Sequence, residues 1–286
     1  MDELTLPGEK PRNFIDLEKV IAGKNPRLLK VLPGFIIDYL KRIIHQDEVN
    51  RMIRENQHLF GLDFLEVVLK EMGARIHVDG IENLSKSNRW TVVANHPLGG
   101  LDGMALMGVI GKIRPDIVFP VNDILMNLEN LKVLFIPINK HGSNSGNVRI
   151  IDETYSSDKA VLYFPAGLCS RKIHGKICDL EWKKSFITKT KLHKRDIVPA
   201  HIDGRNSNWF YNLAWLRAKL GIKANIEMLY LVDEMFKQKN KDIRIVFGEP
   251  IPYTTFDKRY TDLAWAQKLK DHVYQLSSNP NAKFIV

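Results

Sequence analysis

A histidine and an aspartate lie close together in the sequence, where a strongly apolar run ends. The stretch WTVVANHPLGGLDGMAL (90–106) places His96 after that run and Asp102 at the start of an apolar helical pattern. An imidazole has an ordinary pKa of about 6.5, so a small shift makes it a base at neutral pH. A carboxylate on its second ring nitrogen would fix the tautomer and stabilise the imidazolium. We predict that Gly99 and Gly100 fold the loop back, so that Asp102 reaches His96 and the pair acts as a general base.

Asp102 also has a purely structural alternative. It could be the N-cap of the helical pattern GMALMGVIG (103–111), where its carboxylate would satisfy free backbone amides. Pro97 and the two glycines would then only shape a turn. Both roles could hold together, so the spacing leaves the choice open.

The stretch YFPAGLCSRK (163–172) is a second candidate loop, and it also follows an apolar strand pattern. Gly167, Ser170 and Arg171 could bring backbone amides and a guanidinium together to hold an anion. The alternative is an ordinary turn from a strand into a helix, with a solvated basic end.

A third candidate lies in DIVPAHIDGRNS (196–207), where His201, Asp203 and Arg205 follow another strand pattern. An imidazole, a carboxylate and a cation would again lie at the end of a strand. The alternative is that His201 is a strand histidine whose hydrogen-bonding groups are satisfied by its neighbours.

Other kinds of site are disfavoured by the residues present. The two cysteines, Cys169 and Cys178, are too few for a disulfide framework. Together with His174 they lack the fourth ligand and the spacing of a metal site. The chain has neither a phosphate-binding loop nor a dinucleotide glycine fingerprint. We predict no metal and no bound cofactor.

The chain is basic, with 42 Lys and Arg against 33 Asp and Glu and a net charge of +9. This excess favours a polyanionic partner such as nucleic acid, anionic lipid or an acidic carrier protein. The basic residues lack the interleaved aromatic side chains of an RNA-binding sheet. The dense run KKSFITKTKLHKR (183–195) equally fits a solvated helix face. We predict no nucleic-acid partner.

The N-terminal stretch MDELTLPGEKPRNF lacks the apolar core of a signal peptide. No uncharged apolar run approaches the ~20 residues that span a bilayer. These features predict a cytoplasmic protein, either soluble or peripheral on the inner face of the cytoplasmic membrane.

The elements that would position these loops fall into two regions. Residues 1–74 predict a helical N-terminal region with a break at Pro33 and Gly34. Within it, PGFIIDYLKRII (33–44) has bulky apolar residues beside two basic ones, as in a helix that lies in a lipid interface. A helix packed on a protein core is the alternative. The helical spans are 13–23, 25–57 and 61–74.

Residues 75–286 predict one α/β domain. Short runs of β-branched and aromatic residues alternate with helical patterns, which is typical of a mostly parallel central sheet flanked by helices. We predict strands over 75–78, 90–94, 116–121, 133–138, 160–165, 196–202, 226–232 and 243–251. We predict helices over 102–113, 147–157, 182–192, 209–221 and 261–278.

Five blocks, taken in order, resemble those of the glycerolipid acyltransferase superfamily, whose type members acylate lysophosphatidic acid. ANHPLGGLDG resembles the first block, with its histidine and aspartate, and LKVLFIPINKHG resembles the second. LYFPAGLCSRK resembles the third block, IVPAHI the fourth, and FGEPI the closing strand. The match extends over about residues 75–252. It implies the α/β fold of that superfamily.

The resemblance also implies how the site works. His96 would remove the proton of an acceptor hydroxyl as it attacks an acyl thioester, Asp102 would orient His96, and no covalent enzyme intermediate would form. Backbone amides near Gly167 or in the glycine loop would stabilise the oxyanion. The residues implied in substrate binding are Asn95, Gly99, Gly100, Asn139, Lys140, Phe164, Pro165, Gly167, Ser170, Arg171, Pro199 and Arg205.

Three departures from the family pattern bear on the acceptor. The catalytic pair encloses five residues, one more than is usual in the family. Ala166 and Cys169 stand where the third block has a glutamate and an arginine, and a basic residue comes only at Arg171. The second block ends in Asn139 and Lys140 instead of an arginine. These positions bind the acceptor's phosphate in the family, so the departures favour a different head group.

The variant pattern resembles a bacterial branch that includes hemolysin-like members and the O-acyltransferases that complete ornithine or glycine lipids. Their acceptor is a lyso-lipid with a hydroxyl and a carboxylate head, which Arg171, Lys140 or Arg205 would meet. We expect transfer of a fatty acyl group from acyl carrier protein or acyl-CoA to a lyso-amino-acid lipid or a lysophospholipid, at the cytoplasmic membrane surface. The alternative is a catalytically impaired lipid-binding protein of the same fold.

Overall fold

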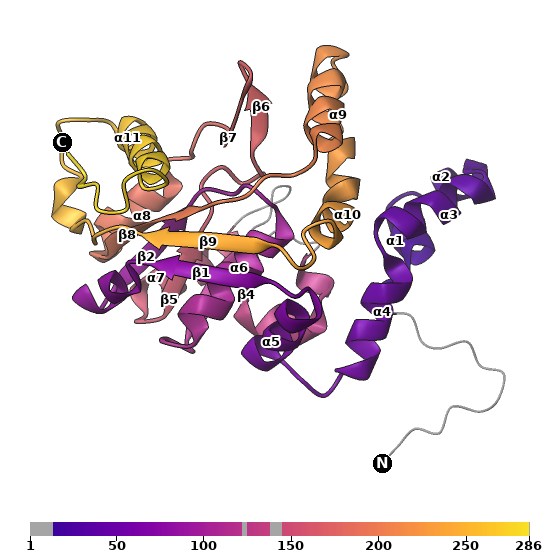
Figure 1. Ribbon diagram of the computed structural model, residues 1–286, viewed down its shortest axis with the longest axis horizontal. Coiled ribbons are helices and arrows are strands. Elements are labelled where there is room, and N and C mark those ends of the chain that lie inside the picture. The colour runs from indigo at the N-terminus through magenta and orange to yellow at the C-terminus, as the bar shows by residue number, and fades with distance from the viewer. Residues whose placement is uncertain (1–13, 122–124, 138–144, 286) are drawn as a thin grey trace. The chain divides into compact units, whose positions relative to one another are not determined.

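The computed structural model describes residues 14–121, 125–137 and 145–285. The chain divides into two compact units, Met1–His58 and Leu59–Val286 (Figure 1). The boundary predicted after residue 74 would place α5 (Gly61–Glu71) in the helical N-terminal region. In the structure α5 packs against α6 (Gly100–Gly111), inside the second unit.

The described part of the first unit is helical. Its helices are α1 (Leu17–Lys24), α2 (Pro26–Val31), α3 (Gly34–Ile43) and α4 (Gln46–Glu55). The side chains of Asp16 and Asn25 each accept a backbone N–H and begin α1 and α2. Pro33 separates α2 from α3 at the predicted break. The Asn50 side chain joins α4 to both backbone groups of Ile15, each at 2.8 Å. No helix in the described ranges of the chain is long and apolar enough to cross a bilayer.

The second unit is built on a seven-stranded sheet in the order β1-β9-β8-β2-β5-β3-β4. Its strands are β1 (Arg75–Asp79), β2 (Trp90–Ala94), β3 (Ile117–Val121), β4 (Phe135–Pro137), β5 (Ala160–Tyr163), β8 (Asp196–Ile202) and β9 (Asp242–Phe247). The neighbours from β8 to β4 run parallel to one another. The pair β9 and β1 runs antiparallel to them. The predicted mixed α/β fold with a mostly parallel sheet is confirmed.

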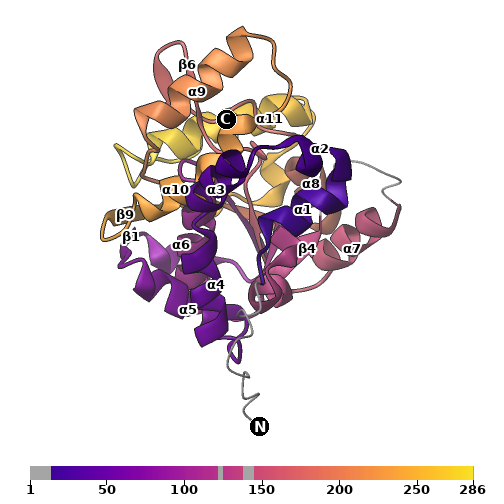
Figure 2. The ribbon, with the colours of Figure 1, turned by 90° about the vertical axis from the view of Figure 1, so that its right-hand side faces the viewer.

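Helices cover both faces of this sheet (Figure 2). α5 and α6 lie on one face, and α8 (Ser185–His193) and α11 (Asp262–Gln275) lie on the other. Because both faces are covered, every residue of β2 is buried, and the strand is a continuous apolar run without alternation. On the second face, Trp182, Phe186 and Trp265 belong to one large apolar core. α7 (Ser145–Ser156) and α9 (Asn208–Lys219) complete the longer helices of the described residues.

The predicted strand over 226–232 is wrong. These residues form a short 3-10 helix followed by α10 (Leu231–Phe236). A short apolar run does not distinguish a buried strand from a buried helical segment. The segment and the helix after it contain two fully buried glutamates, of which Glu227 pairs with arginines and Glu234 with Ser207.

The loop after β5 does not lead into a helix, but forms a β-hairpin. Its strands are β6 (Arg171–Ile173) and β7 (Lys176–Cys178). The turn between them is His174-Gly175, and both residues have positive φ, at 46° and 81°. Such a turn matches the twist of a two-residue hairpin. The hairpin brings the residues that follow β7 back toward the loop after β2.

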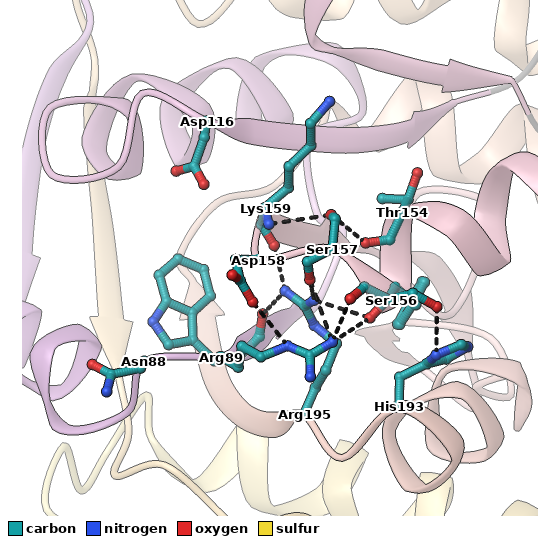
Figure 3. Close-up of polar contacts among 12 residues, drawn as sticks. Asn88, Arg89, Asp116, Thr154, Ser156, Ser157, Asp158, Lys159, His193 and Arg195 are labelled. Carbon is teal, nitrogen blue, oxygen red and sulfur yellow. Dashed lines mark hydrogen bonds and ion pairs between the residues drawn. The ribbon is translucent and has the colours of Figure 1, made fainter.

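Arg195 fixes the end of the sheet at which the parallel strands begin (Figure 3). Its fully buried guanidinium donates to four backbone carbonyl oxygens, those of Trp90, Tyr155, Ser157 and Lys159. They lie at the start of β2, at the end of α7 and just before β5, so one side chain joins three elements. Burial lowers the pKa of Arg195 to about 10, which leaves it charged at neutral pH.

Candidate active site

Three loops at the carboxyl ends of parallel strands form the candidate site. They follow β2, β5 and β8, and β2 lies between the other two strands. This is the edge at which ligands bind in open α/β sheets. Asn95 fixes the first loop to β8, since its Oδ1 accepts the Ile202 N–H at 2.7 Å and its Nδ2 donates to the Ile202 carbonyl at 2.9 Å. The Asn95 amide is therefore engaged by the backbone.

His96 and Asp102 meet across the glycine bend, with His96 Nδ1 3.0 Å from Asp102 Oδ1. Gly99 makes the bend with a φ of +87°, which a side chain disfavours. Asp102 is fully buried in the first turn of α6, and its carboxylate also accepts the backbone N–H groups of Leu98, Gly99 and Gly103. Asp102 therefore both accepts amides at the beginning of α6 and holds His96. The predicted N-cap position is wrong, because the N-cap of α6 is Gly99 and Asp102 is the third residue of the helix.

A phenyl ring also holds the imidazole. Phe164, from the loop after β5, stacks on His96 with ring centroids 4.2 Å apart and an interplanar angle of 18°. Phe119 of β3 supports Phe164 edge to face at 5.3 Å. The His96 side chain remains 18% exposed, and its Nε2 has no hydrogen-bond partner among the described residues. Nε2 is therefore the ring atom that can take a proton from a ligand.

Asp179 is a fully buried carboxylate beside His96 that the sequence analysis did not identify. Its Oδ1 accepts the His96 backbone N–H at 3.2 Å and the Ser170 hydroxyl at 2.6 Å. Its Oδ2 accepts the Trp182 indole N–H at 2.9 Å, and its own N–H donates to the Tyr274 hydroxyl at 2.8 Å. Asp179 follows His96 by 83 residues and reaches it through the unpredicted hairpin, so no local spacing signals it.

Burial and charge compete to set the pKa of His96. Burial lowers this pKa, because the imidazolium loses its hydration. The charge of Asp102, its hydrogen bond to the ring and the charge of Asp179 raise the pKa, while the Arg171 cation lowers it. The net result is a pKa above the ordinary histidine value. The two carboxylates thus make His96 a stronger base than burial alone would allow.

Arg171, predicted to meet the anionic head group, is already paired. Its Nη2 lies 2.9 Å from Oε1 of the fully buried Glu227, whose Oε2 lies 2.8 Å from Arg217 Nε. Arg171 Nη1 also donates to the Cys169 carbonyl at 2.6 Å. These contacts join the hairpin to the segment before α10, and they engage the guanidinium within the protein.

Two predicted residues flank Phe164 in the loop after β5. Gly167 is exposed with a φ of +67°, and its N–H closes a turn on the Phe164 carbonyl at 3.1 Å. Pro165 is buried, and its carbonyl accepts the Lys183 N–H at 3.2 Å. The structure thus brings Phe164, Pro165, Gly167 and Ser170 to one loop beside His96.

Other predicted residues are not brought to His96 by any described contact. Pro199 is buried in the middle of β8, where its carbonyl accepts the Gly248 N–H at 2.8 Å. Arg205 is exposed before α9 and donates to the side chain of Asn208 at 2.6 Å. Asn139 and Lys140 lie outside the described residues.

The third candidate of the sequence analysis forms its own pair. His201 Nε2 lies 3.0 Å from Asp203 Oδ1, and this hydrogen bond lowers the pKa of Asp203. The His201 ring meets the Tyr274 ring edge to face at 5.6 Å. Both residues, together with Asp203 and Ser170, line a cavity of about 150 Å³ whose lining does not include His96.

Cysteine chemistry finds little support at this site. Burial raises the pKa of Cys169 to about 11, so its sulfur stays a protonated, weakly nucleophilic thiol at neutral pH. Cys178 is also a free thiol. In the ranges that the structure describes, no three His, Cys, Asp or Glu side chains gather closely enough to hold a metal ion.

Comparison with known proteins identifies the family. A family model described as Acyltransferase matches residues 19–278. A lyso-glycine lipid O-acyltransferase of Bacteroides thetaiotaomicron is 48% identical over 265 residues, which cover 92% of this chain and 97% of that protein. A protein of the same name from Phocaeicola vulgatus is 47% identical over 265 residues, which cover 92% of this chain and 95% of that protein.

A solved structure also aligns with this chain. It is the crystal structure of the 1-acyl-sn-glycerophosphate (LPA) acyltransferase PlsC from Thermotoga maritima, with a TM-score of 0.47 and 17% identity over 76% of this chain and 82% of that one. The chain belongs to the acyltransferase family, and the prediction of an O-acyltransferase is confirmed.

Proposed function

We propose that this acyltransferase moves a fatty acyl group from a thioester donor to the hydroxyl of a lyso-glycine lipid. The single observation that carries the mechanism is the hydrogen bond between His96 Nδ1 and the buried Asp102, which leaves Nε2 free. The acceptor class is supported by 48% identity to a protein named lyso-glycine lipid O-acyltransferase. Lyso-ornithine lipid and lysophospholipid are the competing acceptors.

The proposed reaction is a direct transfer. His96 Nε2 takes the proton of the acceptor hydroxyl while the oxygen attacks the thioester carbonyl, and a tetrahedral oxyanion forms. The carbonyl then re-forms, the carbon–sulfur bond breaks, and the imidazolium returns its proton to the leaving thiolate. Asp102 keeps Nδ1 protonated and stabilises the imidazolium during both steps. The products are the ester and the free thiol of the donor, and no side chain is acylated.

The oxyanion needs donors on the side of the site opposite the base. The Gly167 N–H is taken by the Phe164 carbonyl, so it does not fit this role. The next two amides, of Leu168 and Cys169, have no hydrogen-bond partner among the described residues. We assign the oxyanion to these amides, because Phe164 in the same loop stacks directly on His96.

The donor and the membrane contact complete the proposal. An acyl carrier protein and acyl-CoA are both polyanions, and the net charge of +9 favours either. In the first unit, Val31 and Phe35 are four residues apart and more than 70% exposed. We propose that this apolar edge, with the basic residues around it, contacts the cytoplasmic membrane surface that holds the acceptor.

The test is acyl transfer by the purified full chain, with lyso-glycine, lyso-ornithine and lysophospholipid acceptors and with each donor. We expect the diacylated glycine lipid to form fastest. His96→Ala should lower kcat by about 10²–10⁴-fold, because general-base catalysis contributes that much. His174→Ala, at the exposed hairpin turn, is the matched control and should leave kcat unchanged.

Two results would contradict the proposal. Full activity of a folded His96→Ala protein would remove the general base from the mechanism. Vesicle binding without any thioester cleavage, for every donor and acceptor, would instead support the catalytically impaired lipid-binding alternative.

A further inference from the structure

Helix α9 carries apolar side chains on the face that points away from the rest of the second unit. It lies beside the β6–β7 hairpin and projects from the second unit (Figure 1). Its inward residues Phe210, Tyr211 and Ala214 are buried. At 100° per residue, positions 209, 216 and 220 fall within about 40° of arc on the outer side. The exposed apolar residues of α9 and the segment after it, called here the α9 surface, are Trp209, Trp215, Leu216, Leu220, Ile222 and Leu229, each at least 41% exposed.

The distribution of tryptophan singles out this surface. The chain has five tryptophans, and the two exposed ones both lie on α9. The other three, Trp90, Trp182 and Trp265, are at most 2% exposed. Indole combines an apolar body with one N–H donor, and it is enriched where an apolar phase meets water. Two exposed indoles on one helix therefore indicate a partner with such a boundary.

The charges around the α9 surface have one sign. Residues 204–226 contain four basic residues and no acidic residue. Arg217 is paired with the buried Glu227, and the exposed cations are Arg205, Lys219 and Lys223. Lys219 Nζ lies 5.0 Å from the centre of a Trp215 ring, so cation and indole share one patch. Apolar side chains bordered by lysine are typical of a helix in the interface of an anionic bilayer.

The start of α9 is joined directly to the loop that carries His96. Asn206 Nδ2 donates to the Pro97 carbonyl at 3.4 Å. Gly204 lies so close to Leu98 that an added Cβ would be 2.8 Å from it. The first turn of α9, which carries Trp209, is therefore next to the loop whose imidazole is proposed to deprotonate the acceptor.

We propose that the α9 surface inserts into the interfacial layer of an anionic membrane and brings the candidate active site to it. This proposal rests on the proposed function, because an enzyme that acylates a lyso-lipid must reach that lipid in the membrane. The apolar residues stand out from a convex helix, whereas an acidic carrier protein would need exposed cations at the centre of its contact. Here the six exposed apolar side chains outnumber the three exposed cations.

The first experiment measures co-sedimentation of the full chain with vesicles of phosphatidylcholine and phosphatidylglycerol, and with phosphatidylcholine vesicles alone. Leu220→Glu removes an apolar contact and adds a like charge to the lipid head groups, so binding to the mixed vesicles should fall at least about tenfold. Leu192→Glu is the matched control, because Leu192 on α8 is 64% exposed and Leu220 is 65% exposed. It should bind like the wild type.

The second experiment uses the tryptophans as reporters. Brominated lipid should quench the wild-type fluorescence, and the double variant Trp209→Phe and Trp215→Phe should lose that quenching while still binding. Persistent quenching in the double variant would place the insertion elsewhere. Unaltered vesicle binding of Leu220→Glu, with or without weaker binding to acyl carrier protein, would overturn the proposal. Neither measurement requires acyl transfer, so vesicle binding and quenching can still be interpreted if the transfer assay fails.

Discussion

Asp179→Asn tests whether the buried carboxylate positions His96 in addition to holding the fold. The carboxylate accepts hydrogen bonds from the His96 N–H, the Ser170 hydroxyl and the Trp182 indole. The side-chain amide of the asparagine keeps one accepting oxygen, but its NH2 group faces donors that the carboxylate accepted from. Hydrogen bonds to a charged group contribute about 1.5–3 kcal/mol and neutral ones about 0.5–1.5 kcal/mol. Removing the buried charge also removes its desolvation cost, which offsets part of this loss. We therefore expect the free energy of unfolding to fall by about 2–4 kcal/mol.

The pH dependence of kcat/KM gives the decisive readout for the same variant. The negative charge of Asp179 raises the pKa of His96, so removing it must lower that pKa. Because neutral His96 accepts the proton in the proposed reaction, the acid limb of the profile should move to lower pH. The maximum of kcat/KM should also fall, since the loop loses its anchor on the His96 N–H. A purely structural residue would change the folded fraction and leave the acid limb in place.

The assay follows acyl transfer between pH 5 and pH 9, over the range in which histidine titrates. Glu181→Gln is the control, because Glu181 is exposed two residues further along and loses the same charge. It should keep both the stability and the profile of the wild type. An acid limb that stays in place or moves to higher pH in a folded Asp179→Asn protein would refute the reasoning.

Three further substitutions each test one residue. Asp102→Asn should lower kcat by at least about 10²-fold and shift the acid limb to lower pH, because the charge and hydrogen bond that raise the pKa of His96 are lost; rate–pH profiles check this. Arg195→Met removes four hydrogen bonds to carbonyl oxygens, of which those of Tyr155 and Ser157 also accept from Arg89. It should lower the free energy of unfolding by about 2–4 kcal/mol in urea titrations, with an unmoved acid limb. Gly99→Ala meets a φ of +87° and a Cβ contact of 3.0 Å to Leu231, and should cost about 1–3 kcal/mol of stability and lower kcat. An unchanged melting curve would contradict either stability prediction.

The contact between His96 and Asp102 could be predicted from the sequence because its geometry is local. His96 and Asp102 enclose five residues, and two of these are glycines that permit the bend. The mostly parallel sheet was also accessible, since strands buried on both faces are continuous apolar runs such as β2. These features depend on residues within one turn or one strand.

The missed features depend on contacts between distant segments. Asp179 reaches His96 only through the β6–β7 hairpin, and its neighbours in sequence do not reveal a buried carboxylate. Arg171 is a basic residue at the expected place, yet Glu227 engages it from 56 residues away. Residues 226–232, predicted as a strand, are helical in the structure, and Glu227 lies within them. No single-sequence periodicity contains this information.

The double role of Asp102 has a consequence for reading relatives of this chain. Its carboxylate accepts three backbone amides at the beginning of α6 besides the imidazole. A descendant that abandoned chemistry would still need this aspartate to nucleate the helix. Retention of the acidic residue is therefore a marker of the scaffold, and under the proposed mechanism only the imidazole would distinguish a working enzyme. Inactive members of such a lineage should be sought among sequences that keep the aspartate and have replaced the histidine.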